Sequence, residues 1–215
     1  MVVHFQNIPA YIFDGALNPA GVPRLGNGYT IIGLLGLLDK AGIFEVNKEQ
    51  LLGAINRLKN DASELKKQAM ADAVEYEGYI PVIFAAEHLS GNAQILRNQF
   101  NETSKSFSAC YLIPDLNHHL MEGLAFPKHH VLKFIILNST NFSEKIKKRV
   151  QLTSDVVEKN MFDVSELNLG GTNAYDDFIL TLAYGSYLTL FLGLTHEQNP
   201  AVNPWVDWFK EELAK

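Results

Sequence analysis

Glu102 and His118 are the side chains whose types and spacing best fit proton transfer. Glu102 belongs to a polar helix end over 101–105, and His118 follows an apolar run over 106–113 that predicts a buried strand. A carboxylate near apolar surface and an imidazole can both exchange protons near neutral pH. Because α/β folds place their chemistry at strand ends, the two residues form a candidate acid/base site. The structural alternative is a surface Glu102 paired with Lys105 and a histidine that caps a turn.

Two pairs of adjacent histidines, at 118–119 and 129–130, raise the question of a metal site. Adjacent side chains point in different directions, and the spacing matches neither H-E-x-x-H nor a three-ligand zinc pattern. His118 and Glu122 would share a helix face, but two ligands do not make a site. The sequence therefore predicts no metal, and it places the second pair in a solvated loop beside Pro127.

A glycine turn, Gly170-Gly171-Thr172, precedes a long apolar segment and could offer free N–H groups to a phosphate. No lysine follows as in a P-loop, and the fingerprint G-x-G-x-x-G is absent. The favoured interpretation is a plain turn in which Thr172 or Asn173 caps a helix. No dinucleotide cofactor is expected.

Composition restricts the class of protein. The 215 residues are 47% hydrophobic, enough for a globular core, and the net charge of −6 argues against a nucleic-acid-binding surface. The single cysteine, Cys110, lies in an apolar run, which excludes a disulfide framework and favours a cytoplasmic protein. No uninterrupted apolar run is long enough to predict a membrane span.

Hydrophobic patterning predicts the elements that must position these residues. Residues 1–28, rich in Pro and Gly, are interpreted as a linker, and 29–44 as an apolar helix that closes at Gly42. A second helix starts at residue 47 or 48, and its polar continuation to residue 77 is typical of a surface helix pair.

From residue 79 onward, short apolar strands alternate with helices. The predicted strands are 79–86, 106–113, 132–138 and 162–167, and the predicted helices are 88–100, 143–160, 173–192 and 203–215. Ser143 is expected to cap its helix, and Gly193 to stop the long one. The alternation predicts an α/β fold, a three-layer parallel sheet with helices on both faces, because parallel strands need crossover helices.

Several segments together resemble a known family, the bifunctional phosphoglucose/phosphomannose isomerases of archaea and some bacteria, which are built from two sugar isomerase (SIS) domains. FNETSK over 100–105 is similar to the family's N-E-x-x-K segment, and PDLNHHLMEG over 114–123 to its P-x-x-N-H-N-x-x-x-G segment. VPRLGNGYTIIG over 22–33 resembles the segment that opens the second SIS domain. YLTLFLGL and VNPWVDWFK, over 187–194 and 202–210, resemble the closing helices.

The resemblance implies a domain organisation. Residues 1–28 would end a missing first SIS domain, 29–172 would form the second, flavodoxin-like SIS domain, and 173–215 a helical C-terminal extension packed on it. In this family the first domain carries the Ser/Thr-rich loop that binds the sugar phosphate, and no stretch of this sequence replaces that loop.

The resemblance also implies a role for each matching residue. Glu102 matches the base that moves a proton between C2 and C1 of the sugar through an enediolate. His118 matches the histidine assigned to ring opening, which is contributed across the dimer interface to the neighbour's site. Arg24 matches the arginine that stabilises the negatively charged intermediate, and Lys210 matches a lysine of the last helix that assists ring opening.

Three asparagines complete the implied site. Asn203 stands where Thr or Gln is usual and where the choice between glucose and mannose epimers is thought to be set. Asn101 and Asn117 lie in the two central motifs and are assigned to substrate binding. His119 stands where an asparagine is common.

The implied reaction is the aldose–ketose isomerisation of glucose 6-phosphate or mannose 6-phosphate to fructose 6-phosphate, without metal or cofactor. This chain would supply the acid/base half of the site in a homodimer, with the missing first SIS domain provided in cis or in trans. Neither nucleic acid nor membrane is an expected partner. The alternative is a non-catalytic SIS module for sugar-phosphate binding or dimerisation.

Overall fold

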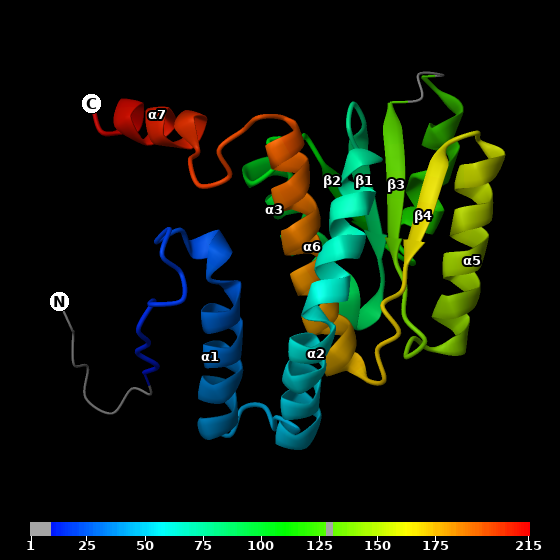
Figure 1. Ribbon diagram of the computed structural model, residues 1–215. Helices are drawn as coiled ribbons and strands as arrows, with labels where there is room; N and C mark the ends of the chain where they lie inside the picture. The colour runs from blue at the N-terminus through cyan, green and yellow to red at the C-terminus, as the bar shows by residue number, and fades with distance from the viewer. Residues whose placement is uncertain (1–9, 128–130) are drawn as a thin grey trace. The chain divides into compact units, whose positions relative to one another are not determined.

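The computed structural model describes residues 10–127 and 131–215 (Figure 1). The chain divides into two compact units, Met1–Leu51 and Leu52–Lys215, and each is described by itself. The predicted loop with His129 and His130 lies outside the described residues.

The N-terminal unit is built around the helix α1 (Asn27–Lys40), which follows a short 3-10 helix, η1 (Pro23–Leu25). The ring of Tyr11 lies against Gly33, where a Cβ atom would come within 2.2 Å of it. The rings of Tyr11, Phe13 and Tyr29 stack in series. The apolar helix predicted over 29–44 is present with shifted ends.

One continuous helix, α2 (Lys48–Val74), replaces the predicted helix pair. Residues 48–74 contain no Pro and only one Gly, Gly53, so no residue in this stretch is expected to end the helix. The core-facing residues Leu65, Ala69 and Ala73 recur at four-residue spacing and are buried. The polar continuation is therefore one side of a helix whose other side packs on the domain.

The larger unit contains a parallel sheet with the strand order β2-β1-β3-β4. The strands are β1 (Ile80–Ala85), β2 (Ala109–Leu112), β3 (Leu132–Leu137) and β4 (Asp163–Leu167). In register, Ile83 pairs with Cys110 on one side and with Ile135 on the other. The central strands β1 and β3 are buried apolar runs, as a sheet covered on both faces requires. The predicted α/β fold is confirmed.

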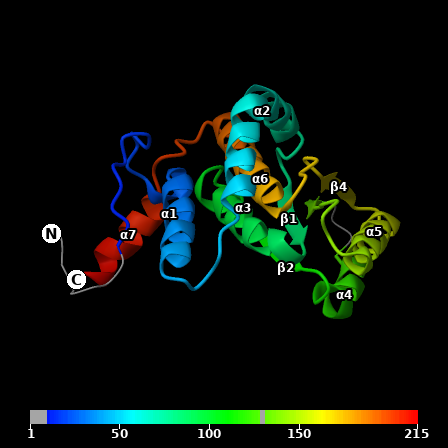
Figure 2. The ribbon, with the colours of Figure 1, turned by 90° about the horizontal axis from the view of Figure 1, so that it is seen from below.

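The helices form a layer on each face of this sheet. In Figure 2, α5 lies on one side, and α3 and α6 lie on the other. Their bounds are η2 (Glu87–Leu89), α3 (Ser90–Glu102), α4 (Leu116–His119), η3 (Met121–Ala125), α5 (Glu144–Lys159), α6 (Ala174–Thr195) and α7 (Pro204–Leu213). The short α4 and η3 were not predicted, because a single turn carries too little periodicity.

One predicted helix cap and one predicted helix end need correction. Ser143 stands at the N-cap of α5 but makes no capping bond, because its hydroxyl donates to the Glu87 carboxylate at 2.6 Å. Gly193 does not stop α6, which continues to Thr195. Because Gly193 has no side chain, α6 can lie close to the backbone of Thr103 and Ser104.

By length and composition α6 could cross a membrane, the one helix of the described residues for which this holds. Half of its apolar window is buried inside the fold, and Asp176 and Asp177 in its first turn are buried as well. It also packs along α3. These are the properties of a central core helix.

Candidate active site

The carboxylate of Glu102 lies at the end of α3, where the chain turns toward β2. It accepts a hydrogen bond from the side-chain amide of Asn203 at 3.2 Å. Lys105, held at a φ of 59°, donates through its ammonium to the Glu102 carbonyl oxygen at 2.6 Å, to the Val202 carbonyl oxygen and to the Asn203 side-chain oxygen at 2.9 Å. The fold thus brings together two predicted site residues, Glu102 and Asn203.

The end of α6 supports this turn from behind. A Cβ atom on Gly193 would lie 2.8 Å from the Thr103 carbonyl oxygen and 3.2 Å from the Ser104 Cα. The imidazole Nδ1 of His196 donates to the Ser104 carbonyl oxygen at 3.0 Å. Because neighbouring backbone is held this closely, the position of Glu102 depends on α6, and a supported carboxylate is suited to catalysis.

Helix α7 starts from the same place. Asn203 is its N-cap residue, so the hydrogen bonds of Asn203 with Lys105 and Glu102 hold the start of the helix in place. Lys210 lies in α7 and is exposed, and none of the residues of this helix is buried.

His118 lies in α4, which follows the carboxyl end of β2, and its side chain is exposed. The neighbouring Asn117 ties α4 to α5, because its amide donates to the Thr153 hydroxyl at 2.8 Å and its oxygen accepts from Arg149 at 3.3 Å. The predicted substrate residue Asn117 therefore holds the helix that presents His118.

Glu102 and His118 lie beyond opposite ends of β2, since α3 precedes this strand and α4 follows it. A strand of this length spans about 13 Å, whereas proton transfer needs groups within about 3 Å of the reacting atom. Within one copy of the chain, the two side chains are therefore too far apart to act on the same reacting atom.

The other two predicted site residues, Asn101 and Arg24, lie in different parts of the chain. Asn101 donates to the carbonyl oxygens of Arg97 at 2.8 Å and Ser108 at 3.2 Å, which closes the turn from α3 to β2. Arg24 lies half-buried in η1 of the N-terminal unit.

A buried cluster that sequence reasoning missed lies at the carboxyl ends of β1 and β3. The Asp177 carboxylate accepts hydrogen bonds from His88 at 2.9 Å, Ser139 at 2.6 Å and Asn141 at 2.9 Å. Burial raises the pKa of Asp177, but these hydrogen bonds and the charge of His88 outweigh it, so the pKa lies below its usual value. Two acidic residues opening an apolar helix were the available sequence signal.

The glycine turn before α6 has the structural role that the sequence favoured. Asn173 caps the helix by accepting from the backbone of Tyr175 at 2.9 Å and Asp176 at 3.2 Å. The Asp176 carboxylate accepts from both the backbone and the hydroxyl of Thr172. Internal carboxylates thus occupy the helix end where an anionic ligand would bind.

The parallel sheet, whose strand order reverses between β1 and β3, and the helices on both of its faces define a doubly wound α/β domain. A hypothetical protein from Thermus thermophilus has this fold, with a TM-score of 0.65 and 16% identity over 83% of this chain and 52% of that one. A protein from Clostridium difficile 630, provisionally described as a phosphosugar isomerase, has a TM-score of 0.63 and 17% identity over 84% of this chain and 56% of that one.

Residues 65–213 match the family described as bacterial phospho-glucose isomerase C-terminal SIS domain, and the chain belongs to this family. Two similar relatives are bifunctional phosphoglucose/phosphomannose isomerases. The one from Caldicellulosiruptor bescii is 24% identical over 94% of this chain and 63% of its own length. The one from Aquifex aeolicus is 28% identical over 90% of this chain and 59% of its own length. The chain thus spans about three fifths of the relatives it matches.

Proposed function

We propose that this chain supplies the acid/base half of an aldose–ketose isomerase that converts glucose 6-phosphate or mannose 6-phosphate to fructose 6-phosphate. The proposal is supported by the names of its relatives and by the supported carboxylate of Glu102. In this reaction Glu102 removes the proton from C2 of the open aldose, which leaves an enediolate, and the proton returns to C1 to give the ketose.

The separation of Glu102 from His118 along β2 is the observation that carries this proposal. If both residues take part in one reaction, they must come from two copies of the chain. His118 is exposed on α4 and is therefore available to the site of a neighbour, where it would open the sugar ring. The functional unit is then a homodimer with composite sites.

Three further residues would act around the reacting atoms. Arg24 would stabilise the negative charge of the enediolate, because a guanidinium fixed beside an oxyanion favours it. Lys210 would assist ring opening. Asn203, bonded to Glu102, would contact the sugar where epimers differ.

Binding of the phosphate is assigned to an N-terminal SIS domain supplied in cis or in trans. This assignment is supported by the length of the relatives and by the internal carboxylates that fill the N-terminal end of α6. The chain by itself would then be inactive or weakly active.

A mixing experiment tests the composite site. Glu102→Gln and His118→Ala chains are assayed separately and together, with the N-terminal SIS domain of a relative present. Each variant alone should be inactive, because every site lacks one group. Random mixed dimers should recover about a quarter of the wild-type rate, because half are heterodimers with one complete site of two. Zero activity in a mixture whose wild-type control is active would reject the composite site.

The second candidate function is a non-catalytic SIS module for sugar-phosphate binding or dimerisation. It is favoured by the closed helix end at Asp177, which leaves this domain without an open phosphate site at that position. The wild-type chain distinguishes the two candidates. Isomerase activity only after addition of the first domain supports the enzyme, and no activity in any mixture supports the module.

A further inference from the structure

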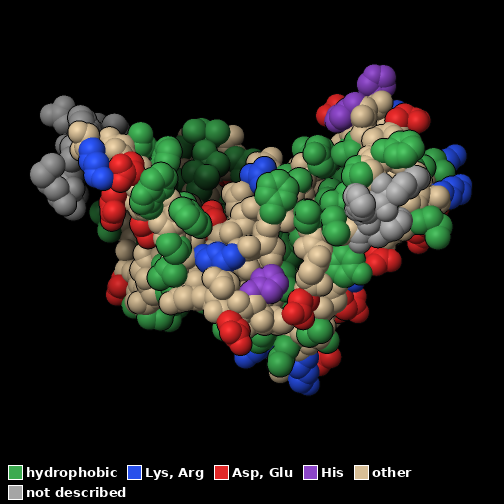
Figure 3. Space-filling view, turned by 90° about the horizontal axis from the view of Figure 1, so that it is seen from above, with side chains coloured by type: hydrophobic (Ala, Val, Ile, Leu, Met, Phe, Trp, Pro, Cys, Tyr) green, Lys and Arg blue, Asp and Glu red, His purple; other side chains and the backbone are tan. Residues whose placement is uncertain are grey.

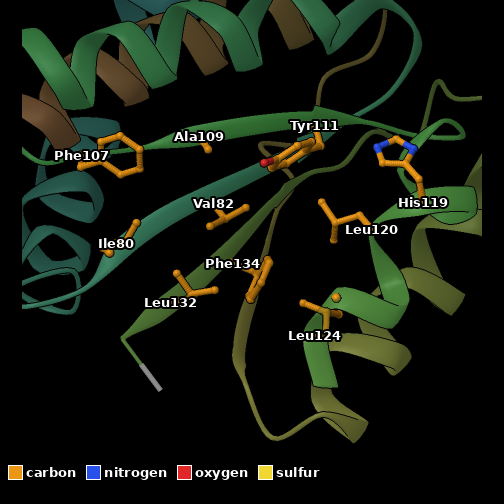
Figure 4. A pocket seen from close by; sticks show the side chains of 11 residues that line it. Ile80, Val82, Phe107, Ala109, Tyr111, His119, Leu120, Leu124, Leu132 and Phe134 are labelled. Atoms are coloured by element: carbon orange, nitrogen blue, oxygen red, sulfur yellow. The ribbon is translucent and has the colours of Figure 1, made fainter. Parts of the chain in front are cut away.

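An apolar groove of about 470 Å³ lies on the sheet beside α4 and η3 (Figure 4). Its floor is formed by side chains of β1, β2 and β3, and its wall by Leu120 and Leu124. Phe107 and Tyr111, which line it, are 71% and 39% exposed. His119 lies beside Tyr111 at one end (Figure 4). A groove of this kind is typical of a protein-binding surface.

Helix α7 presents a matching apolar stripe. Trp205, Trp208 and Phe209 follow the spacing i, i+3 and i+4, and they are 81%, 54% and 57% exposed. Figure 3 shows hydrophobic side chains reaching the surface on the face viewed from above. A ten-residue helix is about 15 Å long, similar to the extent of a short strand, so α7 can lie along one strand of the sheet.

We propose that α7 of one copy docks in the apolar groove of a second copy, and that the exchange is reciprocal in a two-fold dimer. Such a contact is a helix-in-groove interface with aromatic anchors. The inference extends the proposed function, which requires two copies, by naming the surface that joins them.

The area of the contact suits a stable dimer. An aromatic side chain buries about 150–250 Å² in full, and Trp205, Trp208 and Phe209 are 81%, 54% and 57% exposed, so docking can bury about 380 Å² of them. With an equal area of groove, counted twice by symmetry, the contact buries roughly 1,500 Å², within the range of about 1,200–2,000 Å² of specific interfaces.

The contact is also continuous with the composite site. Asn203, the N-cap residue of α7, is hydrogen-bonded to the Glu102 carboxylate, and the groove begins beside the α4 helix that carries His118. Docking would therefore bring Glu102 and Lys210 of one copy toward His118 of the other.

Tryptophan fluorescence measures the docking directly, because Trp205 and Trp208 are the two tryptophans of the chain. Sedimentation velocity should show a dimer forming as the concentration of the full chain rises. The emission should shift to shorter wavelength over the same concentration range, because the indoles leave water. Dimerisation without a shift, or a monomer at every concentration, would contradict the proposal, as would a short-wavelength emission already present in the monomer.

Variants on both surfaces sharpen the test. Trp208→Asp on the helix and Phe107→Asp in the groove should each weaken dimerisation at least tenfold. Met161→Asp, at a 76% exposed position after α5, is the matched control and should leave the dimer intact. Far-UV circular dichroism checks folding, and Tyr111→Lys serves as a second groove variant if Phe107→Asp does not fold.

Mixing the helix variant with the groove variant decides which surfaces meet. The heterodimer keeps one intact helix and one intact groove on opposite copies, so half of the contact returns and the mixture should associate better than either variant alone. If α7 met α7, or groove met groove, mixing would restore nothing. If the Glu102 and His118 chains complement each other while these variants still dimerise, the proposed function stands and this interface is wrong.

Discussion

Replacing Gly193 with alanine tests whether α6 sets the position of Glu102. The added methyl would lie 2.8 Å from the Thr103 carbonyl oxygen and 3.2 Å from the Ser104 Cα, both backbone atoms that cannot rotate away. Alanine raises helix propensity by about 1 kcal/mol, while overpacking against backbone costs about 1–3 kcal/mol. The net loss in the free energy of unfolding is therefore expected to be about 1 kcal/mol.

Gly185→Ala is the matched control on the same helix. It brings the same gain in propensity, but the atoms it meets are the side-chain ends of Leu96 at 2.8 Å and Gln99 at 3.1 Å, which can adjust. The Gly193 variant should be less stable than this control by about 1–2 kcal/mol, which corresponds to a melting temperature lower by about 4 °C in a chain of this size.

Urea unfolding with equal slopes for the two variants gives the difference in stability. In the complemented isomerase assay, displacement of the turn should lower kcat/KM about tenfold for the Gly193 variant and leave the Gly185 variant near wild type. Equal stability and equal activity of the two variants would refute the argument that α6 positions Glu102.

Two further predictions concern the supporting residues. Lys105→Met removes the ammonium that joins the end of α3 to Val202 and Asn203. Limited proteolysis should therefore cut the chain before α7 at least tenfold faster than in wild type. An unchanged rate would show that other contacts hold the start of α7. The pKa of Asp177 in the folded chain lies below its usual 3.8, so between the folded and the unfolded pKa the unfolded chain binds more protons. The stability that ionised Asp177 contributes is therefore present above about pH 4 and is lost as the pH falls through the folded pKa. Asp177→Asn should cost about 3 kcal/mol at pH 7 and flatten the acid limb of the stability curve, and an unchanged acid limb would contradict this assignment.

The main elements of the fold were predictable because their signals are local. Each predicted strand from residue 79 onward has a counterpart in the sheet, and the helices between them follow within a few residues. The α2 helix is the instructive exception. Its polar exposed side suggested separate surface helices, whereas the small residues Ala69 and Ala73 that face the core carry little hydrophobic signal.

The candidate site was predictable only in part. The types of Glu102 and His118 and the strand between them are visible in the sequence, so a pair of proton-transfer groups could be named. The cluster around Asp177 was not visible, because its donors come from loops after two different strands, and only the crossing of the sheet brings them to one carboxylate.

By itself the sequence determined the alternation of strands and helices, the Asn173 cap and the presence of a glutamate and a histidine on either side of one strand. These features depend on neighbours within a few residues, where backbone geometry and hydrophobic periodicity decide the outcome. Only the tertiary structure decided that Lys105 and Asn203, far apart in sequence, meet beside Glu102 and that the end of α6 supports the same turn. Such contacts depend on the packing of α3 against α6, which residues distant in the sequence set together. The separation of Glu102 from His118 along β2 makes a second copy necessary if both act on one sugar.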